Sequence, residues 1–210
     1  MNILHIDCSP RPESHSRQLS AAIVAKLLTI LPEAQVSRRD LGYEPIPHAD
    51  AAYADALATP ASLAAAGRTA DSVLLAEQLI EEVERADVVV IGTPMNNFTV
   101  PSVLKAWIDQ ILRVGRTMKS TPAGKVGLLE DRPVFVGIAS GGVFAGDRAN
   151  QPDFLTTYLT AVLACIGFNT VHYLPMQATA FIDEARAAEV RRSLIATIEP
   201  AMASLARSVD

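Results

Sequence analysis

Residues 88–112 read VVVIGTPMNNFTVPSVLKAWIDQIL, and this stretch contains a complete pattern of strand, loop and helix. The β-branched run 88–91 is typical of a buried strand. Small and polar residues follow, and then apolar residues recur with helical spacing over 100–115. Pro101 fits the first turn of that helix, where its missing N–H is not needed. A strand that leads through a polar loop into a helix is the repeating unit of a parallel α/β sheet.

The same unit recurs on both sides of this stretch. Short apolar runs predict strands at residues 3–6, 35–38, 88–91, 134–138 and 170–174. Longer segments with a period of 3.6 residues predict helices at residues 16–31, 70–86, 100–115, 154–166 and 183–206. The alternation predicts an α/β fold with a five-stranded parallel sheet and helices on both faces. Right-handed crossovers leave few ways to wind such a sheet, and of these we take the doubly wound order 2-1-3-4-5.

Two connections are longer than this scheme needs. Residues 41–68 contain Pro45, Pro47, Pro60 and an alanine-rich stretch, which predict a long connection with one short helix. Residues 115–132 exceed an ordinary loop between helix and strand, so we expect them to be functional or mobile, for instance as a cover over substrate. No internal repeat or interdomain linker interrupts the pattern, and residues 1–210 are expected to form a single domain.

Composition narrows the class of protein. Half of the 210 residues are apolar, and 18 Lys and Arg against 23 Asp and Glu give a net charge of −5. That charge argues against a partner that is duplex nucleic acid or an anionic membrane, since both need a broad basic face. The sequence shows neither a membrane span nor a signal peptide, so we expect a cytoplasmic protein. Cys8 and Cys165 form no metal-binding pattern, and no metal is expected.

The first loop at the carboxyl edge of the predicted sheet reads DCSPRPESHSRQLS, residues 7–20. Ligands of open parallel sheets bind at this edge, where the winding reverses. The loop has no glycine and therefore lacks the dinucleotide-binding turn, and it contains neither a Walker sequence nor Cys-x5-Arg. It offers the hydroxyls of Ser9, Ser14 and Ser16 next to the start of a helix, a combination that suits one phosphate monoester. The alternative is that Ser14 or Ser16 is only a helix N-cap.

The second and third loops read TPMNNFTVPS, residues 93–102, and ASGGVFAGD, residues 139–147. In the second, Met95–Phe98 can lie edge-on to a flat heterocycle; the alternative is a turn with Phe98 in the core. In the third, the pair Gly141 and Gly142 leaves N–H groups free to bind a carbonyl or a delocalised anion. The three loops together predict a site for flavin mononucleotide (FMN), a phosphate joined to a planar ring.

The sequence also resembles a known family. The stretches SPRPESHSRQLS (9–20), TPMNNFTVPSVLKAWIDQILRVGRTM (93–118) and GLLEDRPVFV (127–136), with the glycine pair 141–142, are similar to the FMN-dependent NADH azoreductases. These are also quinone reductases of flavodoxin-like fold. The resemblance covers nearly the whole chain. It implies FMN as cofactor, NADH or NADPH as electron donor, two-electron ping-pong hydride transfer to a quinone or azo compound, and a homodimer whose second subunit completes the site.

The resemblance also implies roles for individual residues. The FMN phosphate would be held by Ser9, Ser14, His15 and Ser16. The isoalloxazine ring would be bordered by Met95, Asn96, Asn97 and Phe98 on one side and by Ala139, Ser140, Gly141 and Gly142 on the other. Backbone N–H groups of residues 141–143 would face the negatively charged edge of the ring, and one near Asn97 would face N5. No side chain is then required as a catalytic group.

Three positions depart from the family pattern. The family commonly has an aromatic residue in place of Asn96, an Arg or another polar residue in place of Ser140, and often Phe in place of Met118. We therefore expect a more open pocket and weaker stacking of flat acceptors such as azo dyes. The physiological acceptor is not predicted.

Two rival interpretations remain at this level. One is an FMN-binding electron carrier that exchanges single electrons with protein partners and does not turn over NAD(P)H; the other is a flavin-free interaction module.

A cluster of cations, Arg113, Arg116, Lys119 and Lys125, either steers the phosphates of a nicotinamide nucleotide or is simply solvated. Trp107 is predicted to lie in the core or in a dimer contact.

Overall fold

Strand β3 (Val88–Pro94) and helix α5 (Ser102–Ile111) form from the stretch quoted first, in a computed structural model that describes residues 1–58 and 70–207. β3 lies at the centre of a parallel sheet whose spatial order is β2-β1-β3-β6-β7. The other strands are β1 (Asn2–Asp7), β2 (Gln35–Asp40), β6 (Val134–Ala139) and β7 (Val171–Met176). Counted along the chain, these five strands have the order 2-1-3-4-5, which confirms the prediction.

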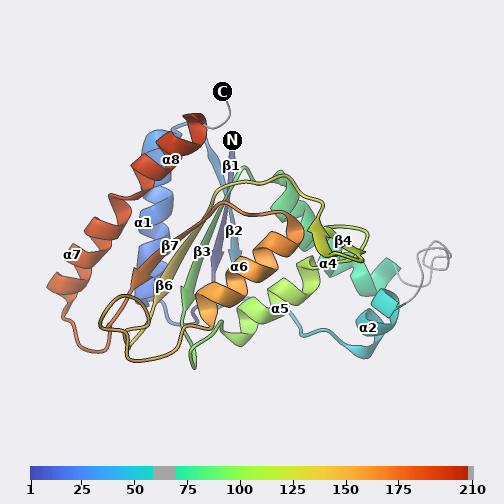
Figure 1. Cartoon of the computed structure of the whole chain (residues 1–210), viewed down its shortest axis with the longest axis horizontal. Helices are drawn as coiled ribbons and strands as arrows, with labels where there is room; N and C mark the ends of the chain where they lie inside the picture. The colour runs from blue at the N-terminus through green and yellow to red at the C-terminus, as the bar shows by residue number, and fades with distance from the viewer. Residues whose placement is uncertain (59–69, 208–210) are drawn as a thin grey trace.

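Helices cover both faces of the sheet (Figure 1). One face carries α1 (His15–Ile30), α7 (Glu184–Ile195) and α8 (Ile198–Arg207); the other carries α4 (Ala70–Arg85), α5 and α6 (Leu155–Ile166). All five strands run in the same direction, so their carboxyl ends meet along the lower edge in Figure 1. The loops predicted to form the site therefore share one edge of the molecule.

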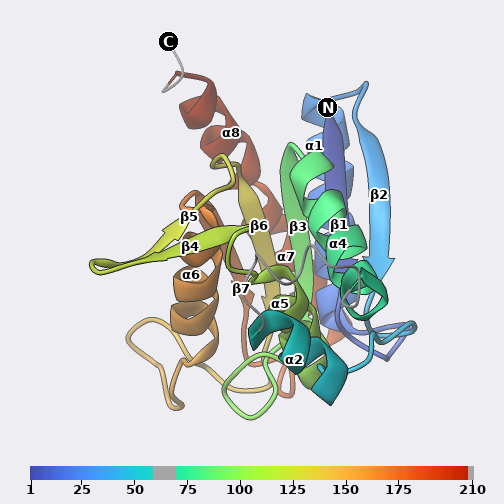
Figure 2. The same cartoon turned by 90° about the vertical axis from the view of Figure 1, so that its right-hand side faces the viewer.

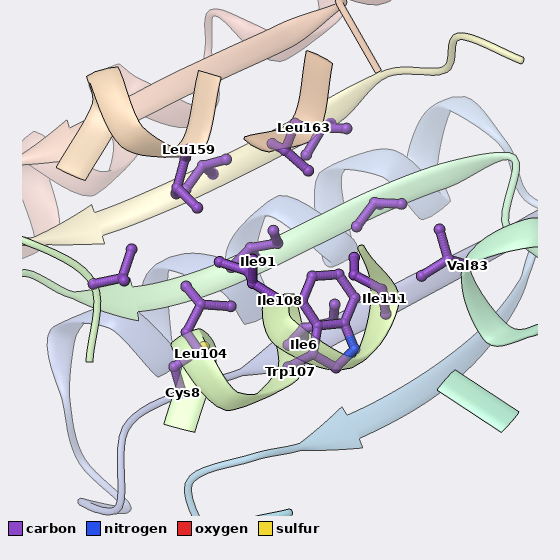
Figure 3. Packing of buried hydrophobic residues seen from close by; sticks show 14 of the residues in the cluster. Ile6, Cys8, Val83, Ile91, Leu104, Trp107, Ile108, Ile111, Leu159 and Leu163 are labelled. Atoms are coloured by element: carbon purple, nitrogen blue, oxygen red, sulfur yellow. The ribbon is translucent and has the colours of Figure 1, made fainter. Parts of the chain in front are cut away.

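The alternation of the strands divides the core into two layers. In β3, Val88 and Val90 pack towards α1, whereas Val89 and Ile91 pack towards α5 and α6, because successive side chains of a strand point to opposite faces. Trp107 of α5 is buried in the second layer, with its ring among aliphatic side chains (Figure 3). Its predicted place in the core is confirmed.

The single helix predicted over residues 183–206 is wrong, because the structure divides it into α7 and α8. Pro200 lies in the first turn of α8, where the absent N–H has no intrahelical acceptor to lose. In the middle of a continuous helix the same proline would remove a hydrogen bond and clash with the preceding turn. The break at residues 196–197 places Pro200 where it is tolerated.

The segment 115–132 contains an antiparallel hairpin, β4 (Met118–Thr121) and β5 (Gly124–Gly127), which reaches out from the body of the protein (Figure 2). Its base is fixed to the end of α6 by the Leu129 N–H, which donates to the carbonyl of Ile166 at 3.0 Å. The expected cover over substrate is not seen within the described chain, since no residue of the hairpin lines the cavity described below. Met118 is buried in β4 and does not line it either.

The connection over residues 41–68 contains the expected short helix, α2 (Ala51–Ala58). The Tyr53 hydroxyl lies 3.3 Å from the carbonyl oxygens of Asp109 and Gln110 and fixes α2 to the end of α5. Pro60 and the alanine-rich stretch 61–66 lie outside the described residues. No helix in the described part of the chain has the length and apolar character that crossing a membrane requires.

Candidate cofactor-binding site

A cavity of about 510 Å³ opens at the carboxyl edge of the sheet, where β1, β3 and β6 end. Eight of the predicted site residues line it: Ser9, Ser14, His15, Ser16, Met95, Asn96, Ala139 and Gly141. The three loops singled out from the sequence thus face one common space. Six residues that were not predicted complete the lining: Pro10, Arg11, Glu13, Pro94, Thr179 and Ala180.

Four predicted residues lie beside the cavity and do not line it. Asn97 and Phe98 form a turn with φ angles of 48° and 71°, and Phe98 is 43% exposed, so the alternative that places Phe98 in the core is wrong. Ser140 is buried, and Gly142 lies against the side chain of Gln151.

The end of the cavity next to β1 is formed by the first turn of α1. Ser14 is the N-cap, and its Oγ accepts the N–H of Arg17 at 3.3 Å, so the capping alternative holds for Ser14 and not for Ser16. The N–H groups of His15 and Ser16 have no acceptor within the described residues, as expected for the first turn of a helix. His15 Nδ1 is also buried there without a hydrogen-bond partner. This end therefore presents several unused polar groups beside the positive end of a helix dipole.

A buried ionic network lies directly beneath this turn. Arg17, only 6% exposed, donates through Nε to the carbonyl of Ser9 at 2.8 Å and through both Nη atoms to the Asp40 carboxylate at 2.8 and 2.5 Å. Gly42 passes so close to the Ser9 carbonyl that any side chain there would collide with it. Arg17 thus joins the first loop to the end of β2 and holds the Ser9 backbone in place.

Asp7 is the second carboxylate of this network. Burial raises its pKa, but the neighbouring His5 imidazole and hydrogen bonds from Arg38 and Ser20 outweigh that effect and lower the pKa to about 2. Arg38 donates to Oδ2 at 2.6 Å, and the Ser20 hydroxyl donates to Oδ1 at 2.8 Å. Sequence reasoning gave Asp7 no role, because its partners come from α1 and β2 and share no local pattern with it.

The other end of the cavity is formed by the loops after β3, β6 and β7. The Met95 N–H donates to the carbonyl of Ala139 at 2.8 Å, which holds the loops after β3 and β6 side by side. The Thr179 N–H donates to the carbonyl of Ser140 at 3.0 Å and adds the β7 loop as a further wall. No signal in the sequence around Thr179 and Ala180 indicated this contribution.

The backbone N–H groups of residues 141–143, here called the glycine turn, fall into two classes. Those of Gly141 and Gly142 donate to no acceptor within the described chain. The Val143 N–H, however, donates to Asn150 Oδ1 at 3.2 Å, so its predicted role toward a ligand is wrong. Two free backbone donors therefore remain on this turn.

The predicted cation cluster is largely neutralised by carboxylates of α4. Arg113 pairs with Glu77, and Arg116 pairs with both Glu77 and Glu84. These acids lie more than 25 residues earlier in the chain, so the sequence around the arginines does not show them. Among the described residues, no group of three His, Cys, Asp or Glu side chains is placed to hold a metal ion.

Comparison with families of known proteins gives one match that spans almost the whole chain. A family model described as flavodoxin-like fold matches residues 1–198. The fold found here agrees with it, since both are defined by a parallel sheet wound in two directions from its first strand.

Curated relatives carry a more specific name. The chain is 46% identical over 185 residues, 88% of this chain and 87% of the relative, to FMN-dependent NADH:quinone oxidoreductase 4 of Pseudomonas fluorescens. It is 48% identical over 191 residues, 88% of each chain, to FMN-dependent NADH:quinone oxidoreductase 5 of Burkholderia lata. Among solved structures, an azoreductase from Bacillus anthracis superposes with a TM-score of 0.79 at 26% identity and covers 96% of each chain.

Proposed function

We propose a function from the family to which the chain belongs, the FMN-dependent NADH:quinone oxidoreductases of flavodoxin-like fold. The protein reduces quinones, azo compounds or both with NADH. It uses FMN held in the cavity at the carboxyl edge of the sheet. The chemistry that FMN supplies when bound is acceptance of a hydride from NADH and delivery of two electrons to the acceptor. The residues of the chain bind and orient the cofactor and shield it from water.

The two ends of the cavity fit the two ends of FMN. The unused N–H groups of His15 and Ser16, the Ser16 hydroxyl and the unpartnered Nδ1 of His15 suit a phosphate monoester. Met95 and Asn96 offer an apolar and an amide surface for the flat ring, with the free N–H groups of the glycine turn beside them. The observation that carries the proposal is this single cavity with phosphate-type donors at one end and an open, glycine-lined wall at the other.

The direct test starts from purified protein freed of flavin. We expect it to bind one FMN per chain, to lose the yellow colour of bound FMN when mixed anaerobically with NADH, and to regain it when a small quinone is added. Failure to take up FMN would overturn the proposal. Uptake of FMN without any colour change on addition of NADH would favour the electron carrier. In steady state, parallel double-reciprocal lines are expected for NADH and quinone, since both use one site in turn.

The proposal includes a homodimer formed by the face that carries the cavity. Phe98 and Phe154 are 43% and 59% exposed there, and the Phe154 N–H donates to the carbonyl of Phe98 at 3.1 Å. Exposed aromatic side chains beside a binding site are typical of an interface. A second copy of the chain would cover them and narrow the entrance to the cavity.

The proposal also places the protein in the cytoplasm, as one domain over residues 1–210. The thiols of Cys8 and Cys165 are free, which suits a reducing compartment. Burial raises the pKa of the Cys8 thiol, which makes it an inert core residue and leaves it no role in the reaction.

A further inference from the structure

Gln151 lies in the long segment between β6 and α6, outside every motif that the sequence analysis singled out. Its side chain is partly buried and points back towards the ends of β3 and β6. It does not line the cavity itself. This polar side chain therefore extends from its own loop to the loops that follow β3 and β6.

The amide of Gln151 contacts one side chain in each of these two loops. Nε2 donates to Ser140 Oγ at 3.0 Å and lies 3.1 Å from Met95 Sδ, so each of its two N–H bonds has an acceptor. Ser140 belongs to the loop after β6 and Met95 to the loop after β3. The Ser140 Oγ and Met95 Sδ atoms are 3.8 Å apart, which closes a triangle of three side chains at the edge of the cavity.

Gly142 makes room for this amide. A Cβ atom at residue 142 would collide with Oε1 of Gln151. The φ angle of Gly142 is not in the left-handed region, so this glycine is needed for space and not for its backbone conformation. The collision involves the end of a flexible side chain, and a methyl group at 142 would therefore displace the amide without disturbing the fold.

We propose that Gln151 is a positioning residue for the ring of the bound flavin, because its amide fixes Met95 and the Ser140–Gly142 turn relative to each other. The inference rests on the proposed function and deepens it. Met95 and Gly141 both line the cavity, and the Gln151 amide adds a side-chain link between their loops to the backbone bond from the Met95 N–H to the Ala139 carbonyl. Gln151 does not touch the ring and is not a catalytic residue.

The test compares Gln151→Ala with Gln35→Ala, a matched loss of an exposed glutamine at the amino end of β2. FMN and riboflavin, which has the ring and no phosphate, are titrated into flavin-free protein. Gln151→Ala should raise the dissociation constants of both ligands by the same factor, roughly 3- to 10-fold, and shift the visible absorption bands of bound flavin. Gln35→Ala should change neither. Unchanged flavin affinity and absorption bands in Gln151→Ala would overturn the inference.

A second pair of variants tests the geometry without any flavin. Gly142→Ala should displace the amide and thereby break the same contact as Gln151→Ala. The two single variants and the double variant should therefore have similar thermal midpoints in the flavin-free protein. Additive losses in the double variant would contradict the contact. If the unaltered protein binds no flavin, the proposed function fails, while this coupling still decides whether Gln151 joins the two loops.

Discussion

At the end of the cavity next to β1, the backbone of a strand-to-helix turn lies over a buried ionic network, whereas at the end next to β3 and β6 the walls are loops joined by few side-chain contacts. The first end owes its shape to charges that are expensive to expose or to leave unpaired. The second owes its shape to hydrogen bonds of ordinary strength. We therefore expect the end next to β1, proposed to hold the phosphate and here called the phosphate end, to be rigid before ligand binds. The end next to β3 and β6, proposed to hold the ring, should be the adaptable end of the site.

The largest effect is expected from Arg17→Met. The substitution keeps most of the apolar stem but leaves the Asp40 carboxylate and the Ser9 carbonyl without their main donor, and it should lower the free energy of unfolding by about 3 kcal/mol. Urea denaturation measures this loss. The matched control is Arg85→Met, which breaks the exposed Arg85–Glu81 pair and should cost less than about 1 kcal/mol. Equal losses in the two variants would show that the network does not support the turn.

The pH dependence of stability tests the same network. Because the pKa of Asp7 is lowered to about 2 from 3.8, its carboxylate stabilises the folded protein at pH values above 3.8. That contribution, about 2 to 3 kcal/mol, is lost as the pH falls through the folded-state value. Urea unfolding between pH 5 and pH 2 should show a shallower decline for Asp7→Asn than for the unaltered protein. Identical slopes would contradict the assigned role of Asp7.

The double variant Ser14→Ala with Ser16→Ala tests the two ends of the cavity separately, because its effect on FMN binding can be compared with its effect on riboflavin binding. It removes two hydroxyls from the phosphate end and should weaken FMN binding by about 1 to 3 kcal/mol, as measured by titration of flavin-free protein. Riboflavin should bind as before, because it has no phosphate. Ser14 is also the N-cap of α1, so Ser16→Ala alone serves as the variant that spares the cap. Unchanged FMN retention in the double variant would refute the phosphate assignment.

The smallest effect is expected at the rim of the adaptable end. Phe154→Asp should weaken self-association by about 1 kcal/mol, because a charge would replace an aromatic ring in the proposed dimer contact. Sedimentation equilibrium over a range of protein concentrations measures it. Leu74→Asp, which alters an exposed apolar side chain on α4, should leave the dimer unchanged. A monomer in both variants and in the unaltered protein would remove the homodimer from the proposal.

The sequence was sufficient for the sheet order and for the edge that carries the site. Apolar runs of period two and 3.6 identify the elements, and the winding of a parallel sheet decides which loops meet. It was not sufficient for the contacts between distant segments. Arg17 and Asp40 are 23 residues apart, and Gln151 lies 56 residues from Met95, so no local spacing connects them.

The missed elements have local reasons. The strands of the β4–β5 hairpin, MKST and GKVG, are four residues long and have no clear apolar alternation, so periodicity does not reveal them. Thr179 and Ala180 reach the cavity only because the β7 loop pairs with the backbone of the glycine turn. Backbone pairing of this kind leaves no trace in side-chain pattern.

We propose that one cavity holds a phosphate at the turn after β1 and a flat ring at the loops after β3 and β6. The most direct measurement is the ratio of the dissociation constants of riboflavin and FMN for flavin-free protein, obtained by calorimetric titration. We expect FMN to bind far more tightly than riboflavin and Ser16→Ala to reduce this ratio. Equal affinity for the two ligands, or no binding of either, would contradict it.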